Sequence, residues 1–444
     1  MSEILFPLDQ PEIEFTASGG SVVHRTVHPS GVRILTEKVP GLQSASVSFS
    51  VGVGSRDETN GHFGSTHFLE HLLFKGTKKR SALDIAVAFD SVGGSSNAST
   101  GKENTSYYAR VQESAVELAI DVIADMLTSS VLDPTEFENE RTVILEELAM
   151  NEDDPSDVAH ERFFEAVLGN HVLGRPIGGT KETITAVSRD AVWEHYQRHY
   201  RPIDLVIAVA GALDHERIVH LVESNLRVAG WNLDVADLPK PRRINRQAEI
   251  SRGSDLKIIP EENSQANILL GMQGLIANDD QRYAMAVLNT VLGGGMSSRL
   301  FQEIREKRGL AYSTYSFNQG YSDGAVFGMY AGCSPAKASE VAKLMLGELE
   351  KIANAGITEQ ELELAYGNVS GGLALKFEST QARMSRLSAV ELGTGEFIDL
   401  DTALERFRAV TNEDVKKLAA ELLVRERSLV AVGSVNDSDF AGLV

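Results

Sequence analysis

One stretch of the sequence recurs about half a chain length later, and this echo constrains the fold more than any other feature. Residues 186–214 align without gaps on residues 409–437, an offset of 223 positions in a chain of 444 residues. Both copies read as an amphipathic helix followed by an apolar strand and a turn that contains Asp. We therefore expect two α/β domains of similar build, each about half of the chain.

The boundary between the two domains is expected where the hydrophobic period is lost. The segment 228–243 contains proline and charged residues and shows no clear period, which is typical of a linker. We therefore predict an N-terminal domain over 1–229, a linker over 230–250 and a C-terminal domain over 251–444. Apolar runs at 45–51 and 268–272 are expected to be strands that open corresponding sheets.

The five residues His67-Phe68-Leu69-Glu70-His71 carry the strongest chemical signal. Gly64-Ser65-Thr66 before them and Gly76 after them predict a short helix. Because residues four apart share a helix face, His67 and His71 can bind one metal ion. Glu70 then lies close enough to act as a general base on a water at that ion. This order of residues is the inverted form of the usual zinc-peptidase motif.

Two other histidine pairs have the same spacing, His24/His28 and His195/His199. Neither pair has a glutamate placed like Glu70, so we interpret both as structural or surface histidines.

A zinc site needs at least one more protein ligand, and the acidic segment 134–150 offers it. Glu140 and Glu147 are nearly two helical turns apart and share a face, whereas Glu146 points about 100° away from Glu147. If that face meets the metal, Glu147 is the ligand and Glu140 can accept a hydrogen bond from the outer nitrogen of a ligand histidine. The alternative is an acidic helix that simply faces solvent.

These motifs together resemble the inverzincin metallopeptidases, the family of pitrilysin, insulin-degrading enzyme and the β-subunit of mitochondrial processing peptidase. In that family the third ligand is a glutamate about 76 residues after the second histidine, and Glu147 follows His71 by 76 residues. The resemblance implies one Zn²⁺ per chain, bound by His67, His71 and Glu147, with Glu140 in support. It also implies that Glu70 acts as general base on a zinc-bound water nucleophile.

The same resemblance implies the fold and the roles of the two domains. It indicates an α+β fold of two structurally repeated α/β domains, each a mostly antiparallel sheet packed with helices, which form half of a clamshell chamber. The domain over 1–229 would bind zinc and carry out catalysis. The domain over 251–444 would bind substrate and complete the chamber.

The segment 93–100 resembles the family's active-site edge strand, to which an extended peptide adds through main-chain hydrogen bonds. On this reading Asn97, Ala98 and Ser99 bind substrate. The composition, which is rich in glycine, serine and asparagine, also allows a plain loop.

The segment 305–312 resembles a second-half segment whose arginine and tyrosine, seven residues apart, reach the active site from another domain. Arg305 and Tyr312 would then hold the substrate backbone and stabilise the developing oxyanion. Without the resemblance, Arg305 reads as a surface charge among Glu303, Glu306 and Lys307.

A chain with a single half resembles the family members that pair two subunits, in which Arg305 and Tyr312 would serve the partner's zinc site. A homodimer with two active sites is the simplest expectation, and a heterodimer with a metal-free homologue is the alternative. The expected activity is that of a zinc metalloendopeptidase, which hydrolyses unstructured peptides or precursor segments inside the chamber. The alternatives are a non-catalytic or partner-dependent structural subunit of a heterodimeric processing peptidase and a zinc hydrolase of non-peptide amides.

Composition agrees with an enzyme of the cytoplasm. Asp and Glu number 63 against 42 Lys and Arg, a net charge of −21, which argues against nucleic-acid binding. That charge either favours cationic peptides or serves only solubility. The single cysteine, Cys333, excludes an intrachain disulfide and suits a reducing compartment. The N-terminus lacks the features of a secretory or mitochondrial signal, and no apolar run predicts a membrane span, so we expect a bacterial cytoplasmic protein.

Overall fold

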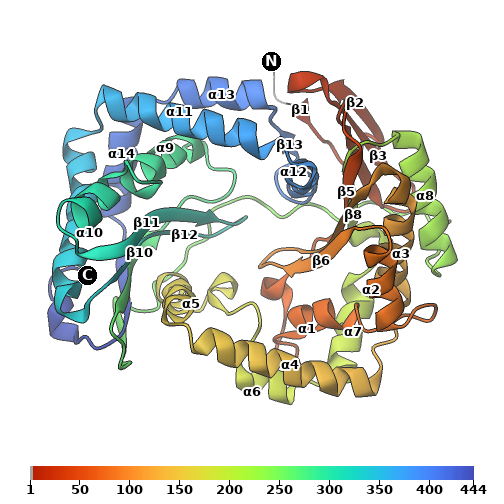
Figure 1. Ribbon diagram of the computed structural model, residues 1–444, viewed down its shortest axis with the longest axis horizontal. Helices are drawn as coiled ribbons and strands as arrows, with labels where there is room; N and C mark the ends of the chain where they lie inside the picture. Colours follow the sequence, from red (N-terminus) through yellow and green to blue (C-terminus); the bar gives the residue numbers. More distant parts are fainter. Residues whose placement is uncertain (1–3) are drawn as a thin grey trace. The chain divides into compact units, whose positions relative to one another are not determined.

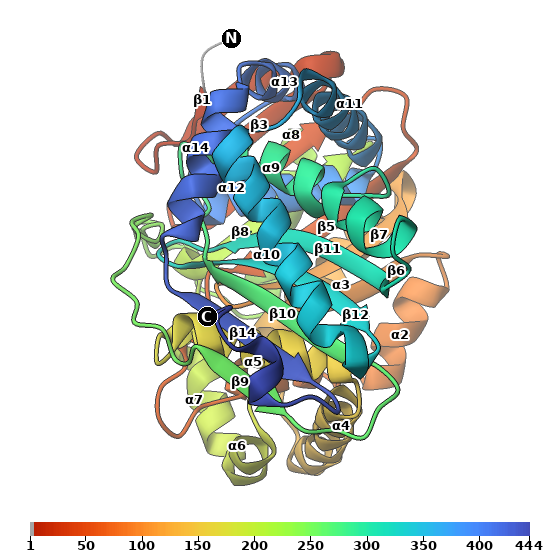
Figure 2. The same cartoon turned by 90° about the vertical axis from the view of Figure 1, so that its left-hand side faces the viewer.

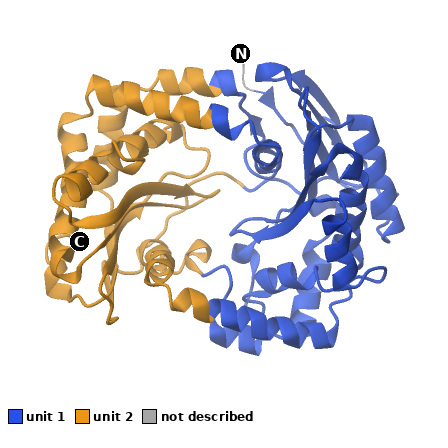
Figure 3. Ribbon diagram, viewed as in Figure 1, with its two compact units in different colours: residues 1–148, 176–243, 374–402 blue, residues 149–175, 244–373, 403–444 orange. Residues whose placement is uncertain are grey.

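The computed structural model describes residues 4–444, which fold into two compact units (Figures 1 and 3). Unit 1, blue in Figure 3, contains the chain up to residue 148 and the segments 176–243 and 374–402. Unit 2 contains 149–175, 244–373 and 403–444. Each unit contains three separate segments of the chain, so a single linker over 230–250 does not divide the chain into these two units. Residues 231–250 themselves form no helix or strand, as expected for a linker.

Unit 1 is built on a seven-stranded sheet in the order β2-β3-β4-β8-β5-β7-β6, in which only β4 and β8 pair in parallel. The strands are β2 (Glu12–Thr16), β3 (Val22–Val27), β4 (Arg33–Lys38), β5 (Ser44–Val51), β6 (Ser95–Thr100), β7 (Thr105–Gln112) and β8 (Leu205–Gly211). β1 (Ile4–Leu5) and β13 (Glu396–Phe397) form a separate short pair. The strand β6 therefore lies at one edge of the sheet.

The helices of unit 1 cover both faces of its sheet. They are α1 (Ser65–Leu72), α2 (Ala82–Asp90), α3 (Val116–Ser129), α4 (Pro134–Glu152, assigned to unit 1 up to Leu148), α6 (Lys181–Ala186), α7 (Arg189–His199), α8 (His215–Val228) and α12 (Thr380–Leu392). Val47 and Phe49 of β5 pack into the main core with α1, α3, α7 and α8. On the opposite face, Ser48 of β5 bonds Ser388 of α12 at 3.0 Å. Apolar residues and serines alternate along β5, so the apolar side chains face the main core and the serines face α12.

Unit 2 is built on a five-stranded sheet in the order β11-β12-β10-β14-β9, in which only β14 and β9 pair in parallel. The strands are β9 (Leu256–Ile259), β10 (Ala266–Gln273), β11 (Ala311–Gly320), β12 (Ala325–Cys333) and β14 (Arg427–Val432). The helices are α5 (Pro155–Leu168), α9 (Arg282–Gly293), α10 (Ala338–Ala355), α11 (Glu359–Lys376, assigned to unit 2 up to Leu373), α13 (Leu400–Arg408, assigned to unit 2 from Ala403) and α14 (Asn412–Leu423). Leu270 packs with α9, α10 and α14, and Leu269 packs with α5 on the other face. Figure 2 shows α10 lying across this sheet.

Five strands of the unit 1 sheet, in the order β6-β7-β5-β8-β4, repeat the order β11-β12-β10-β14-β9 of the unit 2 sheet. The predicted internal repeat is therefore confirmed, and β2 and β3 are an addition to unit 1. Helix α7 and strand β8 follow each other as α14 and β14 do, and α7 and α14 begin 223 residues apart, at Arg189 and Asn412. One helix from each half of the chain packs on the sheet of the other unit. Helix α12 follows α11 in the chain but packs on the sheet of unit 1, and α5 follows α4 but packs on the sheet of unit 2. The α+β class with mostly antiparallel sheets is confirmed as well.

Candidate metal centre

Helix α1 places its polar residues on one side because its apolar residues face the core. Phe68, Leu69 and Leu72 are fully buried, and the ring of Phe68 stacks on Phe137 of α4 at 4.3 Å between centroids. This stacking fixes α1 against α4. The helix predicted around His67–His71 is confirmed, and its N-cap is Gly64, which has a φ of 86°. A side chain at Gly64 would also collide with Ile184, so glycine is required there.

The structure brings His67, His71 and Glu147 together. One potential ligand atom from each lies within 4.8 Å of the others. The two Nε2 atoms of the histidines are 3.3 Å apart. Oε2 of Glu147 lies 3.8 Å from Nε2 of His67 and 3.5 Å from Nε2 of His71. Glu146, the neighbour of Glu147, is exposed on another face of α4, as the helical geometry predicts.

This donor set fits zinc. Two nitrogens at about 2.0–2.1 Å from a tetrahedral zinc are about 3.3–3.4 Å apart, which matches the Nε2 atoms of His67 and His71. Three nitrogen and oxygen ligands leave a fourth position open, as in catalytic zinc sites. The assignment of these three residues as ligands stays a prediction.

Glu140 is buried beside this cluster. Its Oε2 lies 3.0 Å from Nδ1 of His71, and its Oε1 is 2.5 Å from Nζ of Lys75. Because the Glu140 carboxylate accepts a hydrogen bond from Nδ1–H, the proton of the neutral imidazole stays on Nδ1. The lone pair of Nε2 in His71 is then free to face the metal position. Lys75, which the sequence analysis did not single out, balances the charge of Glu140.

His67 is held differently from His71. Its Nδ1 is buried without a hydrogen-bond partner among the described residues, and Gly178 packs against that edge of the ring. Burial and the neighbouring His71 lower the pKa of His67. The neutral imidazole is the form that binds a metal, so this environment favours the ligand form.

Glu70 lies next to the two histidines on α1. Its Oε2 accepts a hydrogen bond from the hydroxyl of Thr100 at the end of β6. Tyr107 and Tyr200 are buried nearby with their hydroxyls 3.1 Å apart, and burial raises the pKa of both phenols. The phenols therefore stay neutral and add no negative charge beside Glu70.

Glu58 is a further residue that local sequence signals did not reveal. Its buried carboxylate accepts hydrogen bonds from the backbone N–H groups of Gly64 and Thr66, both at 2.8 Å. These are the donors that a helix leaves unpaired at its N-terminus, and the negative charge suits the helix dipole. Glu58 lies six residues before Gly64 and so falls outside the usual capping positions.

The predicted edge strand is confirmed as a strand, β6, and the plain-loop alternative is wrong. Asn97 and Ser99 are exposed, whereas Ala98 is buried toward the core. The strand pairs with β7 on one side only. Its other side is an edge of the kind to which an extended peptide can add. The role of these three residues in substrate binding stays a prediction.

Arg305 and Tyr312 belong to unit 2, where they contact each other. Nη1 of Arg305 donates a 2.9 Å hydrogen bond to the carbonyl of Tyr312, and the guanidinium lies over the rings of Tyr312 and Phe301 at 4.5 and 4.7 Å. The Tyr312 side chain is 75% exposed. The pair is thus preassembled on a π-helical turn (Phe301–Glu306) and the start of β11.

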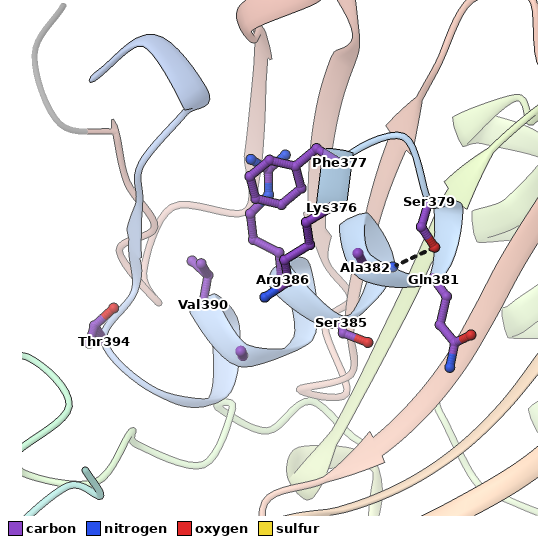
Figure 4. A pocket seen from close by; sticks show the side chains of 10 residues that line it. Lys376, Phe377, Ser379, Gln381, Ala382, Ser385, Arg386, Val390 and Thr394 are labelled. Atoms are coloured by element: carbon purple, nitrogen blue, oxygen red, sulfur yellow. Dashed lines mark hydrogen bonds between the residues drawn. The ribbon is translucent and has the colours of Figure 1, made fainter. Parts of the chain in front are cut away.

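A groove of about 650 Å³ also lies along α12 in unit 1 (Figure 4). Its lining consists of Lys376, Phe377, Ser379, Gln381, Ala382, Ser385, Arg386, Ala389, Val390 and Thr394. None of these is a predicted site residue.

Comparison with known proteins places this geometry in a family. Residues 33–181 match the model described as Insulinase (Peptidase family M16), and residues 186–367 match the Peptidase M16 inactive domain. The first match contains His67, Glu70, His71, Glu140 and Glu147. An uncharacterized zinc protease of Streptomyces coelicolor is 46% identical over 96% of this chain and 92% of its own length. The uncharacterized zinc protease YmxG of Bacillus subtilis is 37% identical, over 93% and 98%.

Solved structures show the same fold. A protease from Helicobacter pylori has a TM-score of 0.82 at 23% identity and covers 95% of this chain and 99% of its own. A peptidase M16 inactive domain from Pseudomonas fluorescens has a TM-score of 0.83 at 20% identity, with coverage of 93% and 97%. The predicted family resemblance is confirmed, and the chain belongs to peptidase family M16.

Proposed function

We propose that the protein is a zinc-dependent metalloendopeptidase that cleaves unstructured peptides or precursor segments. The observation that carries this proposal is the convergence of His67, His71 and Glu147 beside the carboxylate of Glu70. These three residues would hold one Zn²⁺. The ion would supply Lewis-acid chemistry, which makes water a nucleophile near neutral pH and polarises a peptide carbonyl.

The chain's own residues supply the rest of the reaction. Glu70 takes the proton from the attacking water and later gives it to the leaving amine. Glu140 keeps the proton of His71 on Nδ1. The free edge of β6 at Asn97–Ser99 offers main-chain groups to an extended peptide. An added strand would hold the scissile bond in one fixed register.

Arg305 and Tyr312 are proposed to bind the substrate backbone and the oxyanion. By analogy with paired members of the family, they serve the site of a second subunit in a homodimer. A heterodimer with a metal-free homologue is the alternative assembly. We also propose that the protein acts in the bacterial cytoplasm. In the described part of the chain, no helix has the length and hydrophobicity needed to cross a bilayer.

A non-catalytic subunit is the second candidate function, because one of the structural neighbours and the second family model are described as an inactive domain. That model matches residues 186–367, which contain none of the three proposed ligands. The complete ligand set and Glu70 in the first half favour the enzyme.

Metal analysis combined with peptide cleavage tests the proposal. The wild type and His67→Ala are assayed for zinc and for cleavage of a mixed library of unstructured peptides, with and without a chelator. We expect about one zinc per chain and chelator-sensitive cleavage, both lost in His67→Ala. Zinc without cleavage would favour the non-catalytic subunit, and absence of zinc from the purified wild type after metal loading would reject the site.

A further inference from the structure

The hydroxyl of Thr100 donates its hydrogen bond to Oε2 of Glu70, and this contact joins the end of the edge strand to the proposed base. In the described chain, no second donor bonds the Glu70 carboxylate. Oε2 therefore accepts one hydrogen bond, whereas Oε1 accepts none from the described residues and has both lone pairs available to receive a proton. A single hydroxyl thus distinguishes the two oxygens of the carboxylate.

Hydrogen bonds hold the backbone of Thr100 in place, which limits the positions from which its hydroxyl can donate. Thr100 pairs with Thr105 across a tight turn, in which the N–H of Gly101 bonds the carbonyl of Asn104 at 2.8 Å. The hydroxyl of Thr105 bonds the carbonyl of Val53 at 3.0 Å. The tip of the turn is also tied down, because the N–H of Ser55 bonds the carbonyl of Gly101 at 3.1 Å.

The same loop reaches the helix that carries Glu70. Three residues beyond Ser55, Glu58 accepts the two backbone hydrogen bonds at the N-terminus of α1. Glu70 is thus held through its helix by Glu58 and through its side chain by Thr100. Both restraints are anchored in the loop 53–58, so the base and the edge strand form one rigid assembly.

We propose that Thr100 is a positioning residue for Glu70, an inference that rests on the proposed peptidase function. A glutamate side chain has several rotamers, and only some of them place a carboxylate oxygen beside the attacking water. The bond from Thr100 selects one rotamer. Because Thr100 ends the strand that carries Asn97–Ser99, the same element aligns the peptide and the base.

Matched substitutions separate this role from a structural one. Thr100→Val keeps the shape and removes the hydroxyl, whereas Thr100→Ser keeps the hydroxyl. Thr128→Val is the control, since Thr128 is also partly buried and its hydroxyl bonds backbone carbonyls, those of Ala124 and Ala229, and no carboxylate. For each variant, kcat, KM, zinc content and melting temperature are measured. The affinity of the metal-free protein for a fluorescent peptide is measured by anisotropy, a readout that needs no turnover.

We expect Thr100→Val to lower kcat roughly 10- to 100-fold, the usual effect of losing a hydrogen bond to a charged group. KM, zinc content and metal-free peptide affinity should stay near the wild-type values, and Thr100→Ser should recover most of kcat. Wild-type kcat in Thr100→Val, or equal losses in both Thr100 variants, would overturn the inference. A loss confined to peptide affinity would overturn it too. An inactive, zinc-loaded wild type would instead reject the proposed function itself.

Discussion

Oε2 of Glu140 lies 3.0 Å from Nδ1 of His71, on the side of the imidazole opposite to the Nε2 that faces His67. Two residues that are 69 positions apart in the sequence thus meet at one imidazole. The contact orients the ring before any metal binds.

Glu140→Gln is therefore expected to weaken zinc binding. The carboxylate orients His71 and makes its Nε2 a better electron-pair donor to the metal. Loss of the carboxylate is expected to lower the metal affinity by about 10- to 100-fold. Competition with a chromogenic chelator measures this affinity. Glu138→Gln is the matched control, because Glu138 lies on the same helix but is exposed and pairs with Arg141. Equal zinc affinity in Glu140→Gln and the control would contradict the role.

Glu70→Gln should bind about one zinc per chain and lose turnover. Glu70 is not one of the proposed zinc ligands, but its carboxylate is the proposed acceptor of the proton from the attacking water. We expect kcat to fall by roughly 100-fold or more, as measured on a metal-loaded sample with a peptide found in the library screen. Glu146→Gln, an exposed change next to the ligand Glu147, should leave kcat unchanged. Substantial cleavage by metal-loaded Glu70→Gln would exclude Glu70 as the base.

Arg305→Ala and Glu70→Gln should complement each other if Arg305 acts on the partner's site. Each variant alone is expected to be nearly inactive. After random exchange of subunits, half of the dimers are mixed and each mixed dimer has one intact site, so roughly a quarter of the wild-type rate should return. Analytical ultracentrifugation of the same mixture checks that dimers form. Failure to regain activity in a dimeric mixture would show that Arg305 does not act across the interface.

His195 gives unit 1 a specific sensitivity to acid. It is buried, Nε2 lies 3.2 Å from the hydroxyl of Thr66, and burial lowers its pKa to about 3. The unfolded chain binds a proton at a pKa of about 6.5 and the folded chain does not, so stability falls as pH drops from about 6.5 toward 3.

Between pH 7 and pH 5 this single group costs about 2 kcal/mol of unfolding free energy. His195→Gln should therefore lose about that much less stability than the wild type over the same interval. Urea unfolding at the two pH values measures the difference. An identical pH dependence in the two proteins would show that folding does not lower the pKa of His195.

The features that could be predicted from the sequence are those that depend on the spacing of residues within one helix or strand. The helix around His67–His71 follows from apolar residues on one face and glycine at both ends, and the common face of Glu140 and Glu147 follows from helical periodicity. The internal repeat predicted two domains of one topology, because each copy keeps its own helix and strand pattern. The strand at Ser95–Thr100 came from the resemblance rather than from its composition.

Only the tertiary structure decided that the common face of Glu140 and Glu147 meets the histidines and does not face solvent. Packing of Phe68 on Phe137 brings α1 and α4 together, and no local pattern encodes that contact. Glu58 and Thr100 act through hydrogen bonds across loops, and such residues look like any surface glutamate or strand threonine in a sequence.

The sequence also did not predict that α5 packs on the sheet of unit 2 and α12 on the sheet of unit 1. A helix with an apolar face shows that it must be buried, but the apolar face does not say against which of two similar sheets. The sequence by itself therefore determined the helix of the motif, the repeated pattern of helix and strand, and the chemistry of the motif. The tertiary structure decided their partners, because contacts between distant segments depend on packing complementarity that a linear pattern does not record.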